Sequence, residues 1–271
     1  MRIRVRLFAV QRELAGTREV SLDLPVGATI EDGWTALVAR FPILAPGRPS
    51  VRFAHNGEYA EPTRALADGD ELACIPPVSG GADEPPEAAA PPAEPPEADR
   101  PIRILELRAD AFPSTLADEL SARLATDADG AIVVFVGRTR QSPGTPAPGQ
   151  ETEAARHIGR TVDALEYEAH EPMALAILDQ IADEIAAQFG VVRLAIVHRT
   201  GVVPLGQASV LVVAASPHRD AAFVAARYAI DETKARTPIW KAERFLDGHV
   251  WIGAPARTGP SPQSTIGDRQ S

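Results

Sequence analysis

Lysine is almost absent from this chain, and the places where it occurs point to chemistry. Of the 27 basic residues 25 are arginine, and the two lysines, Lys234 and Lys241, stand close together in DETKARTPIWKAE. Arginine stays protonated in proteins, whereas a lysine amine can be tuned to exchange its proton. A site that transfers protons, or needs a compact cation at a reacting carbonyl or phosphate, therefore favours lysine. The alternative is a helix end where two cations complement the helix dipole, and residue type alone leaves both open.

A second candidate site is the run Ser216-Pro217-His218-Arg219. Serine before proline predicts a helix start, because proline in the first helical position needs no amide donor. The free amides of a helix N-terminus attract anions, and His218 and Arg219 in the first turn would strengthen that attraction. An ordinary capped surface helix explains the same residues, so taken alone the run does not establish a site.

A third candidate is FVGRTR, from Phe135 to Arg140, which overlaps the end of the apolar run Ala131–Val136. A continuous apolar run predicts a central strand, and the edge where such strands end is a common place for ligand contacts. The alternative is a basic turn. No phosphate-binding loop, GxGxxG, GxSxG or HExxH motif is present. His198 and His249 lack neighbouring ligand residue types, so we expect structural or surface roles for them and no metal site.

The elements that must position these residues fall into two blocks. In residues 1–81, apolar residues alternate from Ile3 to Leu7 and from Val20 to Leu24, which predicts strands, and Thr29 with Asp32 predicts the cap of a helix. Turns at Asn56-Gly57 and Asp68-Gly69-Asp70 and a strand over 71–75 complete a small α+β domain with a largely antiparallel sheet.

Residues 82–101 contain seven prolines and no large apolar residue, and residues 82–100 carry a net charge of −5. We interpret this stretch as a disordered linker, because proline removes amide donors and like charges repel. Residues 258–271 are predicted to be a disordered tail.

The second block, residues 102–257, is predicted to be an α/β or α+β domain. We expect a helix capped by Ser114, a second through Met173 and Ile185, and a third that opens at Ser216-Pro217 and ends near Arg236. The expected strands are 102–107, 131–136, 164–169, 191–197, 208–215, 240–245 and 250–252.

Composition excludes several classes of protein. The formal net charge is −10 and the sequence pI is about 5.1, which argues against broad binding to nucleic acid or membrane surfaces. The single cysteine, Cys74, excludes an intrachain disulfide and fits a cytoplasmic protein. The N-terminus lacks the apolar core of a signal peptide, and no run is long enough for a membrane span.

Residues 1–81 resemble the small subunit of molybdopterin synthase, a ubiquitin-like β-grasp sulfur carrier, in LFAVQRELAG and LADGDELACIPPVSGG. Residues 101–254 are similar to the large, catalytic subunit of the same enzyme. The matching motifs are FVGRTR, LEYEAHEPMA, VVRLAIVHRTG, SPHRDAAF and KARTPIWKAE. Two adjacent halves that match two subunits of one enzyme support each other.

The resemblance implies that an ATP-dependent activating enzyme converts the terminal glycine, matched by Gly81 after Gly80, to a thiocarboxylate. It implies sulfur transfer to cyclic pyranopterin monophosphate in a pocket of the large subunit, which forms the dithiolene of molybdopterin with no cofactor. The family's essential lysines fall on Lys234 and Lys241. We assign Lys234 to proton transfer or carbonyl orientation and Lys241 to substrate binding with acid–base help.

The resemblance also matches Phe135 to a pocket-lining position and gives Arg140, His218 and Arg219 to substrate binding. The large subunit is a dimer in the family, so His218 and Arg219 are expected to serve the neighbouring copy's site. The chain departs from the family after Trp251, where Gly253–Arg257 replaces a stretch that usually ends in a functional arginine. Arg257 is a shifted candidate for that role, and the loop Gln141–Ile158 is longer than usual.

The peptide bond from Gly81 to Ala82 blocks the glycine carboxylate, so we expect cleavage after Gly81. Two alternatives stay open. The first is an intact fusion that acts as a non-catalytic scaffold or pterin-binding assembly protein. The second is a carrier for thiamine synthesis or tRNA thiolation, which the second block disfavours.

Overall fold

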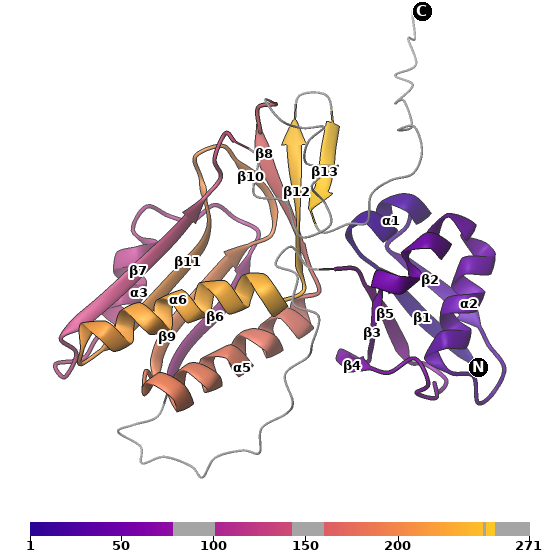
Figure 1. Cartoon of the computed structure of the whole chain (residues 1–271), viewed down its shortest axis with the longest axis horizontal. Helices are drawn as coiled ribbons and strands as arrows, with labels where there is room; N and C mark the ends of the chain where they lie inside the picture. Colours follow the sequence, from indigo (N-terminus) through magenta and orange to yellow (C-terminus); the bar gives the residue numbers. More distant parts are fainter. Residues whose placement is uncertain (78–100, 143–159, 246–247, 253–271) are drawn as a thin grey trace, which may run out of the picture.

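The computed structural model describes residues 1–77, 101–142, 160–245 and 248–252, which form two α+β domains (Figure 1). Gly80, Gly81 and Arg257 lie outside these ranges. So do the predicted linker except Pro101, most of the loop Gln141–Ile158, and the predicted tail.

The N-terminal domain is a five-stranded sheet in the order β2-β1-β5-β3-β4. Strand β1 pairs antiparallel with β2 and parallel with β5, so the first and last strands of the domain lie together at its centre. This mixed sheet confirms the predicted β-grasp class. The elements are β1 (Arg2–Leu7), α1 (Ala9–Ala15), β2 (Glu19–Asp23), α2 (Ile30–Arg40), η1 (Pro42–Ser50), β3 (Arg52–His55), β4 (Glu58–Ala60) and β5 (Glu71–Ile75).

Helix α2 begins where the sequence predicts it. The Thr29 hydroxyl accepts a hydrogen bond from the Asp32 amide, and the Asp32 carboxylate accepts one from the Thr29 amide, so the pair forms a capping box. The apolar face of the helix, with Ile30, Trp34 and Leu37, packs into the core above the sheet. The predicted strand alternation in this domain is likewise confirmed, because Ile3, Val5 and Leu7 are buried in the same core.

The C-terminal domain contains two four-stranded sheets, β6-β9-β11-β7 and β10-β8-β12-β13. No helix in the described ranges is long and apolar enough to cross a membrane. The elements are β6 (Ile102–Arg108), α3 (Leu116–Leu124), β7 (Ala131–Arg138), β8 (Ala164–Ala169), α5 (Glu171–Phe189), β9 (Arg193–Arg199), β10 (Gly201–Pro204), β11 (Ala208–Ser216), α6 (Arg219–Arg236), β12 (Ile239–Phe245) and β13 (Gly248–Ile252).

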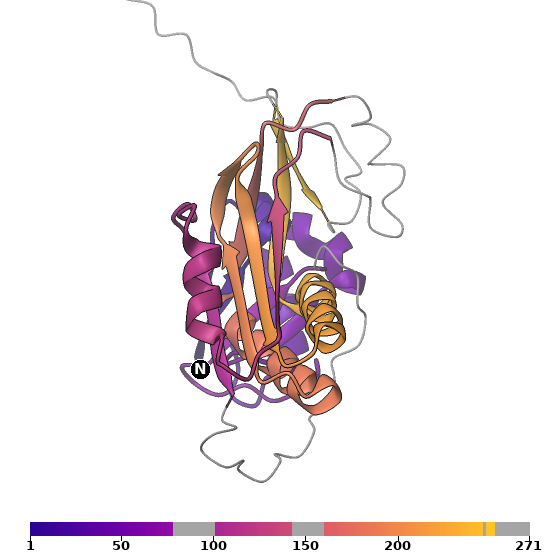
Figure 2. The ribbon, with the colours of Figure 1, turned by 90° about the vertical axis from the view of Figure 1, so that its left-hand side faces the viewer.

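Helices cover both faces of the first of these sheets, with α3 on one side and α5 and α6 on the other (Figure 2). The alternation of strand β11 explains this arrangement. Val210, Val212 and Ala214 pack under α5 and α6, while Leu211 and Val213 pack against α3. Because successive side chains of a strand point to opposite faces, the continuous apolar run of β11 supplies both cores.

Three local predictions are wrong. Helix α3 begins at Leu116 with Thr115 in the cap position and no side-chain cap, so Ser114 does not cap it. Helix α6 begins at Arg219, because β11 continues to Ser216, which pairs with Ala131 in β7. The run from Ala131 is an edge strand rather than a central one, and its second residue, Ile132, is 41% exposed.

A buried cluster of side chains from both domains joins them. The Phe8 ring stacks on Trp240 with centroids 4.9 Å apart and contacts His170 at 5.2 Å. The Glu168 carboxylate accepts a hydrogen bond from the Ala9 amide at 2.9 Å. The buried residues of this cluster are Phe8, Ala9, Val10, Ala54, Ala73, Ile75, Met173, Trp240, Ala242 and Trp251. The first domain is therefore docked on the second through a packed apolar interface.

Candidate active site

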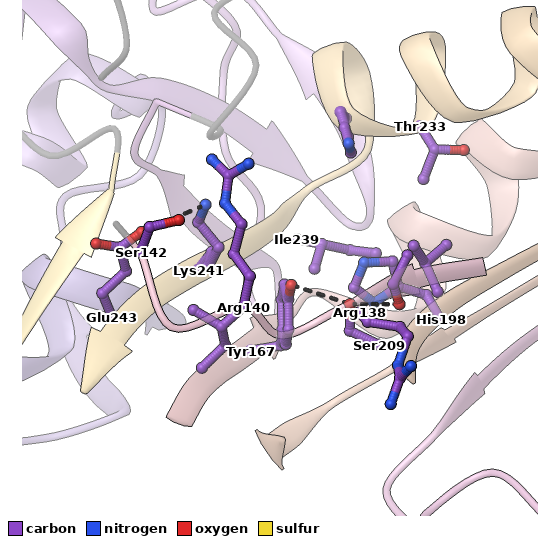
Figure 3. A pocket seen from close by; sticks show the side chains of 14 residues that line it. Arg138, Arg140, Ser142, Tyr167, His198, Ser209, Thr233, Ile239, Lys241 and Glu243 are labelled. Atoms are coloured by element: carbon purple, nitrogen blue, oxygen red, sulfur yellow. Dashed lines mark hydrogen bonds and ion pairs between the residues drawn. The ribbon is translucent and has the colours of Figure 1, made fainter. Parts of the chain in front are cut away.

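Both lysines of the chain line one cavity of about 440 Å³ in the C-terminal domain (Figure 3). Lys234 comes from the last turn of α6 and Lys241 from β12, the strand that follows. The residues that line the cavity are Gly137, Arg138, Arg140, Ser142, Leu165, Tyr167, His198, Ser209, Val210, Thr233, Lys234, Ile239, Lys241 and Glu243.

The local sequence explains how a helix and a strand deliver the two amines to one place. Helix α6 ends at Arg236, and Thr237 is extended, with φ −69° and ψ 130°. Pro238 disfavours helical backbone for the residue before it, so the chain turns directly into β12. Within β12 the alternation of side chains then sorts the residues. Ile239 and Lys241 line the cavity, while Trp240 packs in the interface with the first domain.

The environment of Lys241 lowers the pKa of its amine below the ordinary value. Burial is the largest cause; the nearby carboxylate of Glu243 opposes it, and the charges of Lys234 and Arg140 add to it. The Lys241 Nζ atom lies 3.9 Å from Glu243 Oε1, and this ion pair is drawn in Figure 3. An amine held in this way releases its proton more readily than one in water, which suits a group that exchanges protons during a reaction.

Arg140 adds a guanidinium group to the same cavity, and Figure 3 shows the Arg140 and Lys241 side chains close together, whereas the Arg138 guanidinium points away from them. The Arg138 Nε atom donates to the carbonyl of Gly206 at 2.7 Å, which fixes its stem at the end of β7. Arg140, Lys234 and Lys241 thus bring three cationic side chains to one cavity, which would attract a phosphate-bearing ligand.

The structure places the other predicted site residues elsewhere within one chain. Phe135 packs against the core under α5 and α6 and is not among the residues that line the cavity. His218 and Arg219 are exposed at the start of α6. Lys234 lies fifteen positions after Arg219, so about 22 Å of helix lies between them. Substrate binding by Phe135, His218 and Arg219 therefore stays a prediction.

The last described residues of the first domain contact the opposite face of β12, the strand that carries Lys241. The indole Nε1 of Trp240 donates a hydrogen bond to the Pro76 carbonyl at 3.0 Å, and Trp240 immediately precedes Lys241. Five residues lead from Pro76 to Gly81, and an extended chain of that length spans at most about 17 Å. That length is sufficient to pass around one strand and reach its opposite face.

Sequence reasoning missed the polar residues on the far side of the cavity. The Tyr167 hydroxyl donates to Ser209 Oγ at 3.3 Å, and Ser209 Oγ donates to the Gly137 carbonyl at 3.4 Å. Glu243, the partner of Lys241, was also missed, although its place two residues further along the same strand predicts a shared face. Within the described ranges, no group of three or more His, Cys, Asp or Glu side chains could hold a metal ion.

Fold and site together define a ubiquitin-like domain docked beside a cation-lined cavity of a second, α+β domain. Residues 112–236 match the family described as MoaE protein, and residues 5–81 match the ThiS family. The chain belongs to the molybdopterin synthase catalytic subunit family, with a ThiS-family domain at its N-terminus.

Two curated relatives show the extent of the likeness. The molybdopterin synthase catalytic subunit of Bacillus subtilis is 40% identical over 133 residues, which are 49% of this chain and 76% of that protein. The catalytic subunit of a Nostoc species is 41% identical over 158 residues, or 55% and 87%. Among solved structures, molybdopterin synthase from Staphylococcus aureus is 33% identical, with a TM-score of 0.46; the match covers 54% of this chain and 94% of that one.

Proposed function

We propose that the chain is a molybdopterin synthase whose sulfur carrier and catalytic domain share one polypeptide. Sulfur passes from a thiocarboxylate on Gly81 to cyclic pyranopterin monophosphate. Each new carbon–sulfur bond replaces a carbon–oxygen bond of the substrate, whose oxygen leaves as water or stays with the opened phosphate, and water breaks the carrier's own carbon–sulfur bond. The carrier returns as a carboxylate whose oxygen comes from water, and a second transfer completes the dithiolene. The observation that carries this proposal is the hydrogen bond from Trp240 to Pro76, which anchors the carrier's tail one residue away from Lys241.

The cavity suits both partners of this reaction. Glycine has no side chain, so a diglycine tail can enter a narrow space and adopt backbone angles closed to other residues. Arg140 and the two lysines supply the positive charge that a cyclic phosphate requires. The lowered pKa of Lys241 supports its role in acid–base chemistry, and Lys234 is assigned to proton transfer or to orienting the thiocarboxylate carbonyl.

Cleavage after Gly81 is part of the proposal, since an amide carbonyl cannot be activated as a free carboxylate can. The chain from residue 78 to residue 101 has 24 residues and a contour length of about 80 Å. A connection of this length allows the first domain to dock on the second before the chain is cut. Cleavage is therefore required by the chemistry of the Gly81 carboxylate and not by the length of the connection. Intact-mass analysis of active protein from the native host tests the cut, and a persistent full-length chain would rule it out.

The activity test uses the whole protein, cut after Gly81 and thiocarboxylated by its ATP-dependent activating enzyme. We expect it to convert cyclic pyranopterin monophosphate, whereas the same preparation with a glycine carboxylate should be inactive. Binding of the pyranopterin without conversion by the thiocarboxylated protein would instead support the scaffold function.

We also propose that two copies pair through β7, one of the two edge strands of its sheet. Ile132, Val134 and Val136 on this strand are 41%, 42% and 43% exposed, and apolar edge strands favour pairing with another chain. The β7 residue Ala131 pairs with Ser216, two residues before His218, whereas Arg138 at the other end of β7 lines the cavity. An antiparallel β7–β7 contact would bring His218 and Arg219 of one copy toward the cavity of the other.

A further inference from the structure

One wall of the cavity is formed by His198 of β9 and Tyr167 of β8. His198 is only 7% exposed, and its imidazole meets the Tyr167 ring edge to face, with centroids 4.8 Å apart and an interplanar angle of 80°. Although the ring is buried, its Nε2 atom is not among the fully buried polar atoms that lack a partner in the described ranges. This nitrogen is therefore open to the cavity, where a ligand can meet it.

The partners of His198 fix its tautomer. Its Nδ1 atom lies 2.8 Å from the Arg199 carbonyl, and because a carbonyl only accepts hydrogen bonds, Nδ1 carries the proton. The pKa of His198 is lowered to about 4. Burial is the largest cause, the hydrogen bond to the Arg199 carbonyl opposes it, and the positive charge of Lys234 adds to the lowering. The imidazole is neutral near pH 7, so Nε2 presents a lone pair. Among the described residues Nε2 has no hydrogen-bond partner.

The hydroxyl groups on this wall are likewise left with lone pairs. The Ser209 hydroxyl donates to the Gly137 carbonyl and the Tyr167 hydroxyl to Ser209, and Figure 3 draws the contact between Tyr167 and Ser209 as a dashed line. This wall thus offers acceptors, whereas Arg140 and Lys241 on the other side offer donors. Apolar side chains of Leu165, Val210 and Ile239 complete the lining. The division fits a ligand that carries an anion at one end and a heterocycle with N–H donors at the other.

We propose that His198 Nε2 accepts a hydrogen bond from an N–H group of the substrate's heterocycle and so sets the orientation of the pterin in the cavity. This inference rests on the proposed function and extends it by giving His198 a role in binding. Packing within strand β9 does not by itself require a histidine at this position. With the heterocycle held at His198, the phosphate end lies toward Arg140 and Lys241. The donated proton stays on the substrate, and His198 acts in binding rather than in proton transfer.

Two polar substitutions separate the nitrogen atoms of His198. The amide NH2 of His198→Asn can still donate to the Arg199 carbonyl but leaves nothing at the Nε2 position. His198→Gln places its amide oxygen near the Nε2 position and restores the acceptor. The probe is neopterin monophosphate, a fluorescent pterin with a phosphate, titrated into the full chain. Competition by inorganic phosphate reports the cationic end independently, and thermal unfolding confirms that both variants fold.

We expect His198→Asn to weaken pterin binding about tenfold or more, and His198→Gln to stay within about threefold of the unmodified chain. Phosphate affinity should be the same in all three proteins. Equal pterin affinity in the Asn variant, or equal losses in the Asn and Gln variants, would overturn the role of Nε2 and leave the proposed function standing. Absence of pterin binding by the unmodified chain would overturn both.

Discussion

The two ends of helix α6 carry the two strongest candidate sites of the sequence, and they lie in different surroundings. At the C-terminal end Lys234 enters a cavity that also holds Lys241, Arg140 and Glu243. At the N-terminal end His218 and Arg219 lie exposed, and the Arg219 side chain is 83% accessible. Both ends carry exposed cations, yet within one chain only the C-terminal end borders a cavity, where the Lys241 side chain is 23% exposed.

This difference shows what makes a charged residue useful for chemistry. Burial and neighbouring charges lower the pKa of Lys241, whereas the exposed ion pair of Arg219 with Asp220 is screened by water and contributes little. A helix N-terminus can bind an anion, but it becomes a selective site only when another surface closes over it. In the proposed dimer that surface belongs to the second copy.

The largest expected effect comes from the end of α6 that borders the cavity. Replacing Lys241 by arginine keeps the charge but removes the exchangeable amine, and we expect kcat to fall by about 10² to 10⁴. Lys234→Arg should fall in the same range. Arg227→Lys on the exposed face of the same helix is the matched control and should keep full activity. Single-turnover assays with the thiocarboxylated protein give the rates, and full activity of both lysine variants would remove the assigned roles.

The exposed end gives the next largest effect, and it tests the shared site directly. Arg219→Ala alone should lower activity about tenfold, since one charge-assisted contact to substrate is lost. Mixing Lys241→Arg and Arg219→Ala proteins after dissociation should restore about a quarter of normal activity. Half of the dimers are then mixed, and each mixed dimer has one intact site. If the mixture is no more active than the average of the two separate variants, each active site is formed by a single chain.

Much of this arrangement could be read from the sequence, because the relevant signals were local. The period of two in β1 and the pair Thr29 and Asp32 depend on neighbours only a few residues away. The scarcity of lysine pointed to Lys234 and Lys241 without any knowledge of the fold. These predictions succeed because the preference of the local sequence is the same as the conformation that the folded chain adopts.

The remaining features depend on contacts between distant segments. Tyr167 and His198 come from different strands and meet only when two sheets pack, so no spacing announces them. The apolar run from Ala131 could not reveal whether one or two strands flank it. Ser216 reads as a helix cap, but its pairing with Ala131 in the sheet prevails over that local preference. Sequence also gave no sign of how Trp240 holds the carrier's tail.

A smaller effect is expected at the contact between carrier and cavity. Trp240→Phe keeps an aromatic ring next to Phe8 but removes the hydrogen bond to Pro76, which leaves a buried carbonyl without its donor. We expect the cut carrier to bind its catalytic domain about 5- to 20-fold more weakly, as calorimetry would measure. Trp251→Phe, which removes a partly exposed bond to Glu13 in the same interface, should have less effect. An unchanged affinity in Trp240→Phe would show that the tail is not anchored there.

The smallest effect on activity is expected at a polar cluster that is complete within one chain but lies far from the cavity. Asp70 is bonded by His55 Nε2 at 2.6 Å and by Asn56 Nδ2 at 2.9 Å. Burial favours the neutral acid, yet these bonds and one from the Ala67 amide hold the pKa of Asp70 at about 2, below its ordinary 3.8.

The carboxylate therefore stabilises the carrier fully above about pH 4, and that contribution is lost as the pH falls through 2. The difference in pKa corresponds to about 2 kcal/mol, since each unit is worth about 1.4 kcal/mol. Asp70→Asn should lower the unfolding free energy of the first domain by about that amount at pH 7 and by much less at pH 2, as denaturant titrations would show. Sulfur transfer by the folded variant should stay within about twofold. A large loss of activity without a loss of stability would mean that the hydrogen-bonded cluster around Asp70 influences sulfur transfer although it does not line the cavity. Lining the cavity would then not be what separates functional charged residues from structural ones.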